Sequence, residues 1–372
     1  MLPYLFICMH YLYAETMISH KHYMALALKL AAKAKGNTSP NPMVGCVILK
    51  RNKIVGQGYH KKAGEAHAEA IALVEAGKKA KDSTLYVNLE PCSHWGRTPP
   101  CTEAIVSAGV REVIIGCDDP NPKVSGYQEL KFRGIKTKIG ILDEECKKLN
   151  ECYLKWISTG MPFVVVKAAM SLDGRIATKT GDSRYITGKD ALKFVHQLRS
   201  EVDAVMVGIN TILRDDPQLT VRLVKGEEPV KIVLDSRLRI PLRAKVLGDA
   251  AKVIIATTSK APKAKMNKLL HMGVQVLSIK SDKGRVDVKE LLSELGRREI
   301  TSIMVEGGAT LNSEILRKAL ADKLLMFYAP SLIGKGTEVI GDLGITSLNK
   351  SIKLRDMSTR KIGKDILIEA YV

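Results

Sequence analysis

Residues 67–101 read HAEAIALVEAGKKAKDSTLYVNLEPCSHWGRTPPC, and this stretch decides the fold of the first half of the chain. It supplies an imidazole at His67, a carboxylate at Glu69 and two thiols at Cys92 and Cys101. A catalytic zinc ion takes three protein ligands and keeps a fourth position for water, whose pKa it lowers toward neutrality. We therefore predict that His67, Cys92 and Cys101 bind one Zn²⁺ and that Glu69, free of the metal, transfers protons.

The spacing of these residues is typical of zinc deaminases. His-x-Glu followed by Pro-Cys and a further Cys marks enzymes that attack an amidine-like carbon of a nucleobase. The usual gap between the cysteines is two residues, whereas residues 93–100 separate them here. A longer loop still closes on one metal, because closure entropy grows only with the logarithm of loop length. The alternative is that both cysteines are buried thiols acting as small apolar groups.

Apolar periodicity places this stretch in an α/β layer. Two strands joined by a turn at Arg51 and Asn52 precede it, and a helical period follows from Leu142 to Trp156. The zinc ligands are expected at helix starts, at the carboxyl ends of strands. The predicted helices are residues 22–35, 69–77 and 102–108, and the predicted strands are residues 44–50, 53–59, 85–89 and 110–116.

Beyond Pro162 the pattern changes to short, continuous apolar runs. Such runs are typical of strands buried on both faces of a mostly parallel sheet. They alternate with predicted helices, the first of which has a capping box at Thr187 and Asp190. We therefore expect a second α/β domain, with the boundary within residues 159–162. The runs are FVVVK, AVMVG, KIVLD, KVIIAT, VQVLSI and SIMVE, with KLLMFYAP and DILIEAYV closing the chain, and the helices are residues 190–199, 288–298 and 312–320.

Composition limits the classes of function. The 372 residues are enough for two domains with separate cores. The net charge of +19 comes from basic residues spread along the chain, and aromatic residues make up only 5%, so a surface for nucleic acid is disfavoured relative to a phosphorylated small substrate. Seven cysteines without regular spacing favour a reducing cytoplasm. Residues 1–16 are apolar but lack the features of a signal peptide or an anchor, and we interpret them as a leader or a mis-assigned start.

Long motifs in a constant order carry a resemblance to a known family. They are SPNPMVGCVI, HAEAIAL, EPCSHWGRTPPC and DDPNPKVSG in the first half, and KAAMSLDGRIAT, GDSRYITG, LRSEVDAVMVGINTILRDDPQLTVR, VLDSRLRIP and VEGGATLN in the second. With them, the chain from about Met17 to Val372 resembles the bifunctional enzyme of riboflavin biosynthesis that joins diaminohydroxyphosphoribosylaminopyrimidine deaminase to 5-amino-6-(5-phosphoribosylamino)uracil reductase. The resemblance implies a cytidine-deaminase-like three-layer α/β/α domain at residues 17–160 and a dihydrofolate-reductase-like α/β domain at residues 161–372.

For the deaminase, the resemblance implies that zinc-bound hydroxide attacks C2 of 2,5-diamino-6-(5-phosphoribosylamino)pyrimidin-4(3H)-one. Glu69 would take the water proton and pass it to the departing ammonia. Matching positions are expected to hold the ring and the ribosyl phosphate: Asn41, His60, His94, Arg97, Asp119 and Asn121.

For the reductase, the resemblance implies that NADPH reduces the ribosyl group to a ribityl chain. The turn VEGGAT would bring backbone amides to a phosphate of the cofactor, although an ordinary tight turn explains it equally well. The residues expected at the cofactor are Ala169, Tyr185, Thr211, Asp215, Ser236, Gly308, Ala309, Thr310 and Leu311. Those expected at the substrate are Ser183, Arg199, Leu219, Arg222 and Glu306.

Two alternatives remain open at this point. A nucleic-acid-editing deaminase with a C-terminal binding module would explain the positive charge, but it predicts the two-residue cysteine gap. A fusion with one purely structural half would not need both sets of motifs. We expect a homo-oligomer that acts on a phosphorylated pyrimidine and binds neither nucleic acid nor membrane.

Overall fold

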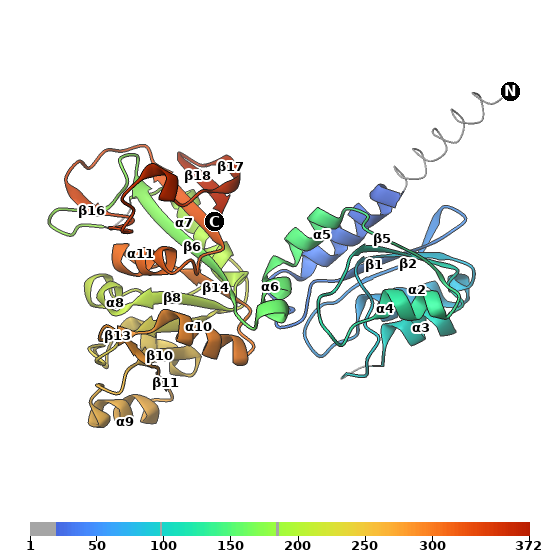
Figure 1. Cartoon of the computed structure of the whole chain (residues 1–372), viewed down its shortest axis with the longest axis horizontal. Coiled ribbons are helices and arrows are strands. Elements are labelled where there is room, and N and C mark those ends of the chain that lie inside the picture. The colour runs from blue at the N-terminus through green and yellow to red at the C-terminus, as the bar shows by residue number, and fades with distance from the viewer. Residues whose placement is uncertain (1–19, 97–98, 184–185) are drawn as a thin grey trace. The chain divides into compact units, whose positions relative to one another are not determined.

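The computed structural model of the chain describes residues 20–96, 99–183 and 186–372. This part of the chain divides into two compact units between Thr159 and Gly160 (Figure 1). The predicted leader, Arg97 and Tyr185 lie outside the described residues. No helix in the described ranges is both long enough and apolar enough to cross a membrane.

The first unit is built on a five-stranded sheet with the order β2-β1-β3-β4-β5. Strand β1 runs antiparallel to β2 and β3, whereas β3, β4 and β5 are parallel. The segments that follow β2, β3 and β4 therefore leave the sheet at the same edge. The strands are β1 Gly45–Lys50, β2 Lys53–Tyr59, β3 Thr84–Leu89, β4 Glu112–Cys117 and β5 Lys136–Ile139.

Helices cover both faces of this sheet. Alternate residues of β1 point to opposite cores: Cys46 and Ile48 pack toward one helical layer, and Val47 and Leu49 pack toward the other. The first layer contains α2 Ala68–Ala76, α3 Cys101–Ser107 and α4 Gly126–Phe132. The second contains a helix described from residue 20 to residue 31, α5 Asp143–Leu149 and α6 Glu151–Thr159. Short 3-10 turns are η1 Ala32–Ala34 and η2 Gly77–Ala80.

Two details differ from the prediction in this unit. The helical period from Leu142 to Trp156 is not one helix, because Asn150 ends α5 and its side chain turns to the backbone of Met43. The Asn150 amide accepts a hydrogen bond from the Met43 N–H at 2.8 Å and donates one to the Met43 carbonyl at 3.0 Å. Cys92 lies in the loop after β3, not at a helix start.

The second unit contains a nine-stranded sheet with the order β11-β10-β9-β8-β14-β6-β15-β18-β17. All neighbours are parallel except β15 with β18 and β18 with β17. The predicted apolar runs are buried on both faces, since Ile303 and Val305 pack into one core and Met304 into the other. The strands are β6 Phe163–Ser171, β8 Ala204–Gly208, β9 Val230–Leu234, β10 Val253–Thr257, β11 Gln275–Ser278, β14 Ser302–Val305, β15 Lys323–Ala329, β17 Arg355–Ile362 and β18 Asp365–Tyr371.

The helices and ribbons of this unit pack around the sheet. Helix α7 begins after Gly188, whose N–H donates to Asp365 at 2.7 Å, so the predicted capping box at Thr187 is wrong. The prediction missed α8, α9 and β17. The helices are α7 Lys189–Ser200, α8 Ile209–Asp215, α9 Lys263–His271, α10 Val288–Arg297 and α11 Ala309–Arg317, with 3-10 turns η3 Lys245–Lys252 and η4 Leu348–Lys350. Two ribbons pair β7 Arg175–Thr178 with β16 Gly336–Glu338, and β12 Ser281–Asp282 with β13 Arg285–Val286.

Candidate active sites

Small residues bring α2 directly against β2. A Cβ atom added at Gly56 would lie 2.2 Å from the Ala72 carbonyl oxygen, and one at Gly58 would lie 2.6 Å from that of Ala68. The two glycines are two residues apart on a strand, and the two alanines are four apart on a helix, so each pair lies on one face. This close packing fixes the start of α2, with His67 as its N-cap, at the edge of the sheet.

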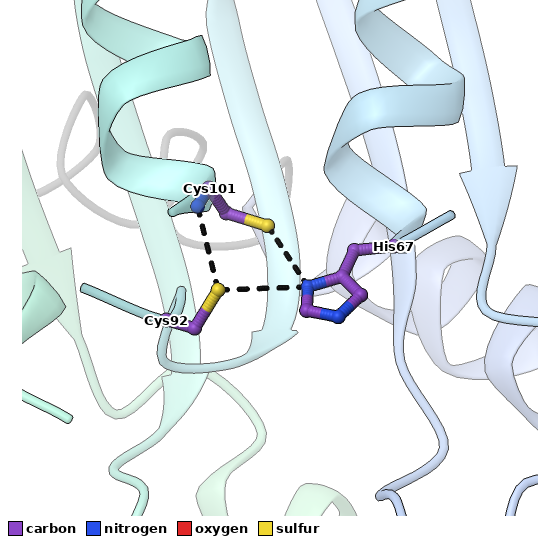
Figure 2. Close-up of side chains that lie close together, drawn as sticks. All are labelled: His67, Cys92 and Cys101. Carbon is purple, nitrogen blue, oxygen red and sulfur yellow. Dashed lines mark hydrogen bonds between the residues drawn. The ribbon is translucent and has the colours of Figure 1, made fainter. Parts of the chain in front are cut away.

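His67, Cys92 and Cys101 converge at this edge (Figure 2). Their ligand atoms all lie within 4.8 Å of one another. His67 Nδ1 is 3.2 Å from Cys101 Sγ and 3.5 Å from Cys92 Sγ, so Nδ1 is the nitrogen that faces both sulfurs. The Cys101 N–H, at the first residue of α3, donates to Cys92 Sγ at 3.3 Å.

This donor set fits a zinc ion. Ligands at about 2.0–2.3 Å from a tetrahedral zinc ion are about 3.6 Å from one another, close to the separations seen here. Hydrogen bonding from Cys101 lowers the pKa of the Cys92 thiol, while the same contact raises the pKa of Cys101. Zinc binds the thiolate form of cysteine, so metal binding would remove the proton from both thiols. Three protein ligands leave the fourth zinc position open for water.

Glu69 lies in the first turn of α2, and only 3% of its surface is exposed. Burial raises the pKa of its carboxyl, and the negative charge of Cys92 raises it further. A carboxyl whose pKa is raised toward neutrality can both take up and release a proton under the same conditions. The fold thus places a carboxyl with a raised pKa beside the three predicted metal ligands.

The loop that contains Asn41 is held on the same side by long-range contacts. Asn88 of β3 accepts a hydrogen bond from the Gly45 N–H at 2.7 Å and donates to the Met43 carbonyl at 3.0 Å. The Asn41 amide donates to His60 Nε2 at 3.0 Å, because His60 Nδ1 donates to the Ala66 carbonyl at 3.1 Å. His60 is buried and its ring lies 5.5 Å from that of His67. Two predicted substrate residues thus meet next to a predicted zinc ligand.

Asp119 and Asn121 lie in the loop after β4 and are bonded to each other. The Asn121 N–H and the Tyr153 hydroxyl both donate to the Asp119 carboxylate, at 2.9 and 3.0 Å. Burial raises the pKa of Asp119. Glu90 accepts hydrogen bonds from the N–H groups of Asp119 and Tyr127, at 3.3 and 2.8 Å. Glu90 therefore ties the end of β3, two residues before Cys92, to this loop and to α4.

Sequence reasoning missed these supporting residues. Asn88, Glu90, Asn150 and Tyr153 all hold the loops that carry predicted site residues. Only Glu90 had a usable signal, because it directly precedes the Pro-Cys ligand motif.

His94, a predicted substrate residue, has a ring nitrogen, Nδ1, that is buried and has no hydrogen-bond partner among the described residues.

In the second unit, a cavity of about 1390 Å³ opens at the carboxyl ends of the parallel strands. Ala169 of β6, Gly208 of β8 and Leu234 of β9 line it, together with Glu306 after β14. This is the edge where ligands bind in open α/β sheets. The other predicted residues on its wall are Ser183, Thr211, Asp215, Ser236, Gly308, Ala309, Thr310, Leu311 and Arg222.

The wall of this cavity fits an anionic dinucleotide. Helix α11 begins at the wall with Gly308 as its N-cap, and a Cβ atom there would meet nothing within 4 Å. Backbone N–H groups at such a helix start favour a phosphate. Ser236 is held in place, because its hydroxyl accepts from the Val286 N–H at 3.0 Å. Further cationic residues line the cavity: Arg214, Arg237, Arg239, Lys245, Lys283, Arg285 and Arg317.

A buried ion network lies at the cavity wall. Glu306 accepts two hydrogen bonds from Arg199, at 2.7 and 3.0 Å, and its carboxylate is 3.7 Å from Lys167 Nζ. Burial acts to raise the pKa of Glu306, but the charges of Arg199 and Lys167 outweigh it and lower the pKa to about 2. Glu306 is therefore ionised at neutral pH. Lys167 also lines the cavity, and sequence reasoning did not select it.

Two predicted substrate residues are not on the cavity wall. Arg199 is buried, with its remaining nitrogen bonded to the Thr220 carbonyl at 3.1 Å. The Leu219 side chain is also buried, and its φ of +55° is in the left-handed region. Of the two arginines expected at the substrate, only Arg222 lines the cavity, with an exposed side chain.

Comparisons with known proteins agree with this geometry. The cytidine and deoxycytidylate deaminase zinc-binding region matches residues 17–117, and the RibD C-terminal domain matches residues 162–368. The riboflavin biosynthesis protein RibD of Aquifex aeolicus is 47% identical over 352 residues, which cover 94% of this chain and 97% of that protein.

Two solved structures are similar over nearly the whole chain. A RibD structure from Acinetobacter baumannii has a TM-score of 0.88 at 38% identity, covering 95% of this chain and 99% of that one. A Thermotoga maritima structure described as a diaminohydroxyphosphoribosylaminopyrimidine deaminase/5-amino-6-(5-phosphoribosylamino)uracil reductase has a TM-score of 0.85 at 36% identity, covering 96% and 99%.

These findings confirm the predicted family and a fold class that joins a cytidine-deaminase-like domain to a RibD reductase domain. They also confirm Zn²⁺ and NADPH as the cofactors. The chain therefore belongs to the RibD family of bifunctional enzymes, which combine a zinc-binding deaminase with a reductase for riboflavin biosynthesis.

Proposed function

We propose that the first unit removes ammonia from 2,5-diamino-6-(5-phosphoribosylamino)pyrimidin-4(3H)-one and that the second unit reduces the product. The observation that carries the first step is the convergence of His67, Cys92 and Cys101 beside a buried Glu69. The Thermotoga maritima relative is described with this pair of activities. The domains that we assign to the two steps are residues 17–160 and residues 161–372.

In the deaminase, His67, Cys92 and Cys101 hold the metal through one nitrogen and two sulfurs. Zinc, when bound, lowers the pKa of water and supplies the nucleophile for C2 of the pyrimidine. Glu69 takes up the water proton and releases it to the amino group that departs as ammonia. His60, neutral because burial lowers its pKa, orients the Asn41 amide toward the ring. We assign the remaining contacts with ring and phosphate to His94, Arg97, Asp119 and Asn121.

In the reductase, the residues of the cavity wall bind and orient both reactants. NADPH, when bound, supplies hydride to C1 of the ribosyl group. The N-terminus of α11, formed by Gly308 to Leu311, holds a cofactor phosphate, and we assign further cofactor contacts to Ala169, Thr211, Asp215, Ser236 and Tyr185. The Ser183 hydroxyl, which we assign to the substrate, donates to the Asp215 carboxylate, which we assign to the cofactor, at 3.1 Å. This hydrogen bond links the two binding regions of the cavity. Glu306 and Arg222 complete the substrate side, and Arg199 and Leu219 support the wall.

The enzyme acts on small pyrimidines, and we further propose that it is a cytoplasmic homo-oligomer. Five cysteines in the described part of the chain are free thiols, which fits a reducing compartment: Cys46, Cys92, Cys101, Cys117 and Cys146. Edge strand β17 exposes seven of its eight residues, among them Met357 with 66% exposure. Exposed edges of this kind are usually covered or paired, and a second copy of the chain is the partner that we propose for β17.

One assay on purified protein tests the two activities and their order. Ammonia is followed after addition of the diaminopyrimidinone ribosyl phosphate, and NADPH absorbance is followed after addition of NADPH. We expect ammonia before NADPH is present, and oxidation of NADPH only once the deaminated product has formed. Oxidation of NADPH with an unchanged diamino substrate would contradict the order, and absence of ammonia from zinc-loaded protein would contradict the deaminase assignment.

A further inference from the structure

The segment 219–222 ends at Arg222, which lines the cavity in the second unit, and begins with a residue whose backbone conformation is unfavourable. Leu219 has a φ of +55°, which a branched side chain adopts only when its surroundings impose it. Three residues later, Arg222 lines the cavity with an exposed guanidinium. The position of this guanidinium therefore depends on the contacts that hold the backbone of residues 219–222.

Three side chains hold three consecutive backbone positions of this segment. Arg199 donates to the Thr220 carbonyl at 3.1 Å. Glu228 accepts from the Val221 N–H at 2.9 Å. At the third of these positions, the Arg222 N–H donates to His196 Nδ1 at 3.2 Å.

Helix α7 supplies two of these side chains from adjacent turns. His196 is fully buried and Arg199 is nearly so, and a spacing of three residues places them on one face of the helix. The loop between Arg222 and β9 also packs closely against α7. A Cβ atom added at Gly226 in this loop would lie 2.4 Å from Cβ of Ser200, the last residue of α7. The face of α7 is thus a rigid support for the segment.

The imidazole of His196 makes its hydrogen bond to Arg222 through Nδ1, while its buried Nε2 has no hydrogen-bond partner among the described residues. Its Nδ1 accepts a hydrogen bond, so the ring proton resides on Nε2. Burial, followed by the charges of Arg199 and Arg222, lowers the pKa of His196 to about 4. The ring therefore remains a neutral acceptor at the pH at which the enzyme works.

We propose that His196 is a positioning residue of the reductase, which fixes the Arg222 backbone so that the Arg222 guanidinium meets the 5′-phosphate of the substrate. This inference rests on the proposed reductase function and on the role assigned there to Arg222. The Arg199 guanidinium is bonded to Glu306 and to the Thr220 carbonyl. Arg222 is the predicted arginine whose guanidinium lines the cavity, where its Nη1 makes one long hydrogen bond, of 3.4 Å, to the Thr220 hydroxyl. Guanidinium groups bind phosphate in a bidentate manner, so their orientation matters as well as their charge.

Selectivity for the phosphate tests this role. The ratio of kcat/KM for 5-amino-6-(5-phosphoribosylamino)uracil to kcat/KM for the same compound without its phosphate is measured with NADPH. In His196→Leu the Arg222 N–H has no acceptor. In His196→Asn the side-chain oxygen lies near the position of Nδ1 and can accept from this N–H. We expect His196→Leu to lower the ratio by about tenfold and His196→Asn to restore most of it.

Three further variants separate the possible outcomes. Arg222→Ala should lower the ratio as much as His196→Leu, and the double variant should lose no more than either single variant, because both act on one contact. Gln197→Ala, an exposed neighbour on α7, should leave the ratio unchanged. Ammonia release and the KM for NADPH serve as controls for folding and should not change.

The outcomes that overturn the inference are distinct from those that overturn the proposed function. If Arg222→Ala lowers the ratio and His196→Leu does not, His196 has no positioning role. Additive losses in the double variant would also refute it, since His196 would then act by another route. If Arg222→Ala leaves the ratio unchanged, the phosphate role of Arg222 is wrong and the inference falls with it.

Discussion

At the scale of single residues, the deaminase site depends on where the first turn of α2 lies. His67 is the N-cap and Glu69 follows two residues later, so both side chains project from a helix start that packs on Gly56 and Gly58. The carboxyl of Glu69 is buried without a cation of its own and its pKa is raised. A group in this state is poised to carry a proton, and not to bind the metal.

Replacement of Glu69 by glutamine tests this role. Glutamine keeps the shape of the side chain but cannot take up a proton from water. We expect Glu69→Gln to reduce ammonia release by about 10²–10⁴-fold, the usual contribution of general acid–base catalysis. Oxidation of NADPH with substrate that is already deaminated should be unchanged, because that reaction uses the cavity of the second unit. Ammonia and NADPH absorbance are the two measurements.

The metal content of the Glu69→Gln protein is the control. Zinc should remain at one ion per chain, since His67, Cys92 and Cys101 are untouched. Loss of both activities in a folded, zinc-loaded variant would refute the assignment of the two reactions to separate sites.

At the scale of elements, the turn between β1 and β2 contains only Arg51 and Asn52. Both have positive φ, at 50° and 61°, as the tight turns of hairpins require. Asn52→Gly should be tolerated in the first unit, because glycine adopts positive φ without strain. Asn52→Ala should destabilise it. Urea unfolding followed by tryptophan fluorescence measures this unit alone, since Trp95 and Trp156 both lie in it. Equal stability of the two variants would contradict the argument.

The break between α5 and α6 is a second feature at this scale. Asn150→Ala removes both hydrogen bonds to the backbone of Met43, which support the loop that contains Asn41. We expect a loss of about 1–3 kcal/mol of unfolding free energy, because the Met43 N–H is left unpaired, whereas the Met43 carbonyl keeps its hydrogen bond from Asn88. The KM for ammonia release should rise as well, because the substrate loop loses its anchor.

Glu145→Ala, an exposed change on the preceding helix, is the matched control and should alter neither quantity. A loss of stability in Asn150→Ala without any change in KM would show that the Met43 anchor does not act on the substrate loop.

At the scale of the whole molecule, the second unit should lose stability in acid. His196 has a pKa of about 4 in the folded state against its usual 6.5, so the unfolded chain takes up this proton first as the pH falls. Stability from this source decreases between about pH 6.5 and pH 4. Glu306 has a pKa of about 2 in the folded state against its usual 4.5, so its contribution is present above pH 4.5 and is lost between pH 4.5 and pH 2.

Hydrogen exchange of amides in β14 follows the stability of this unit across that range. His196→Asn should flatten the pH dependence between about pH 6.5 and pH 4, because the titrating group is gone. Glu306→Gln should flatten the dependence below pH 4.5, although the protein will be less stable throughout because Arg199 and Lys167 lose their counter-charge. An unchanged slope in His196→Asn would contradict the assigned pKa.

Local sequence patterns predicted the α/β class of both units and the three candidate metal ligands. The buried runs 163–167, 204–208 and 302–306 appear as strands because continuous apolar sequence of that length is satisfied only inside a parallel sheet. The trio of His67, Cys92 and Cys101 was identified because side chains of those types, at that spacing, suit a catalytic zinc site. Resemblance supplied a minority of the residues on the cavity wall of the second unit, including Thr211 and Ser236.

Local sequence patterns indicated many of the strands and helices and the residues that could bind zinc, since those properties depend on neighbours along the chain. Only the tertiary structure decided which residues hold the sites in place. Arg199 meets Glu306, and Asn150 meets Met43, each across 107 positions of sequence. The cause is physical: such a hydrogen bond forms only when packing of the sheet and helices has brought the two groups together, and no periodicity records it.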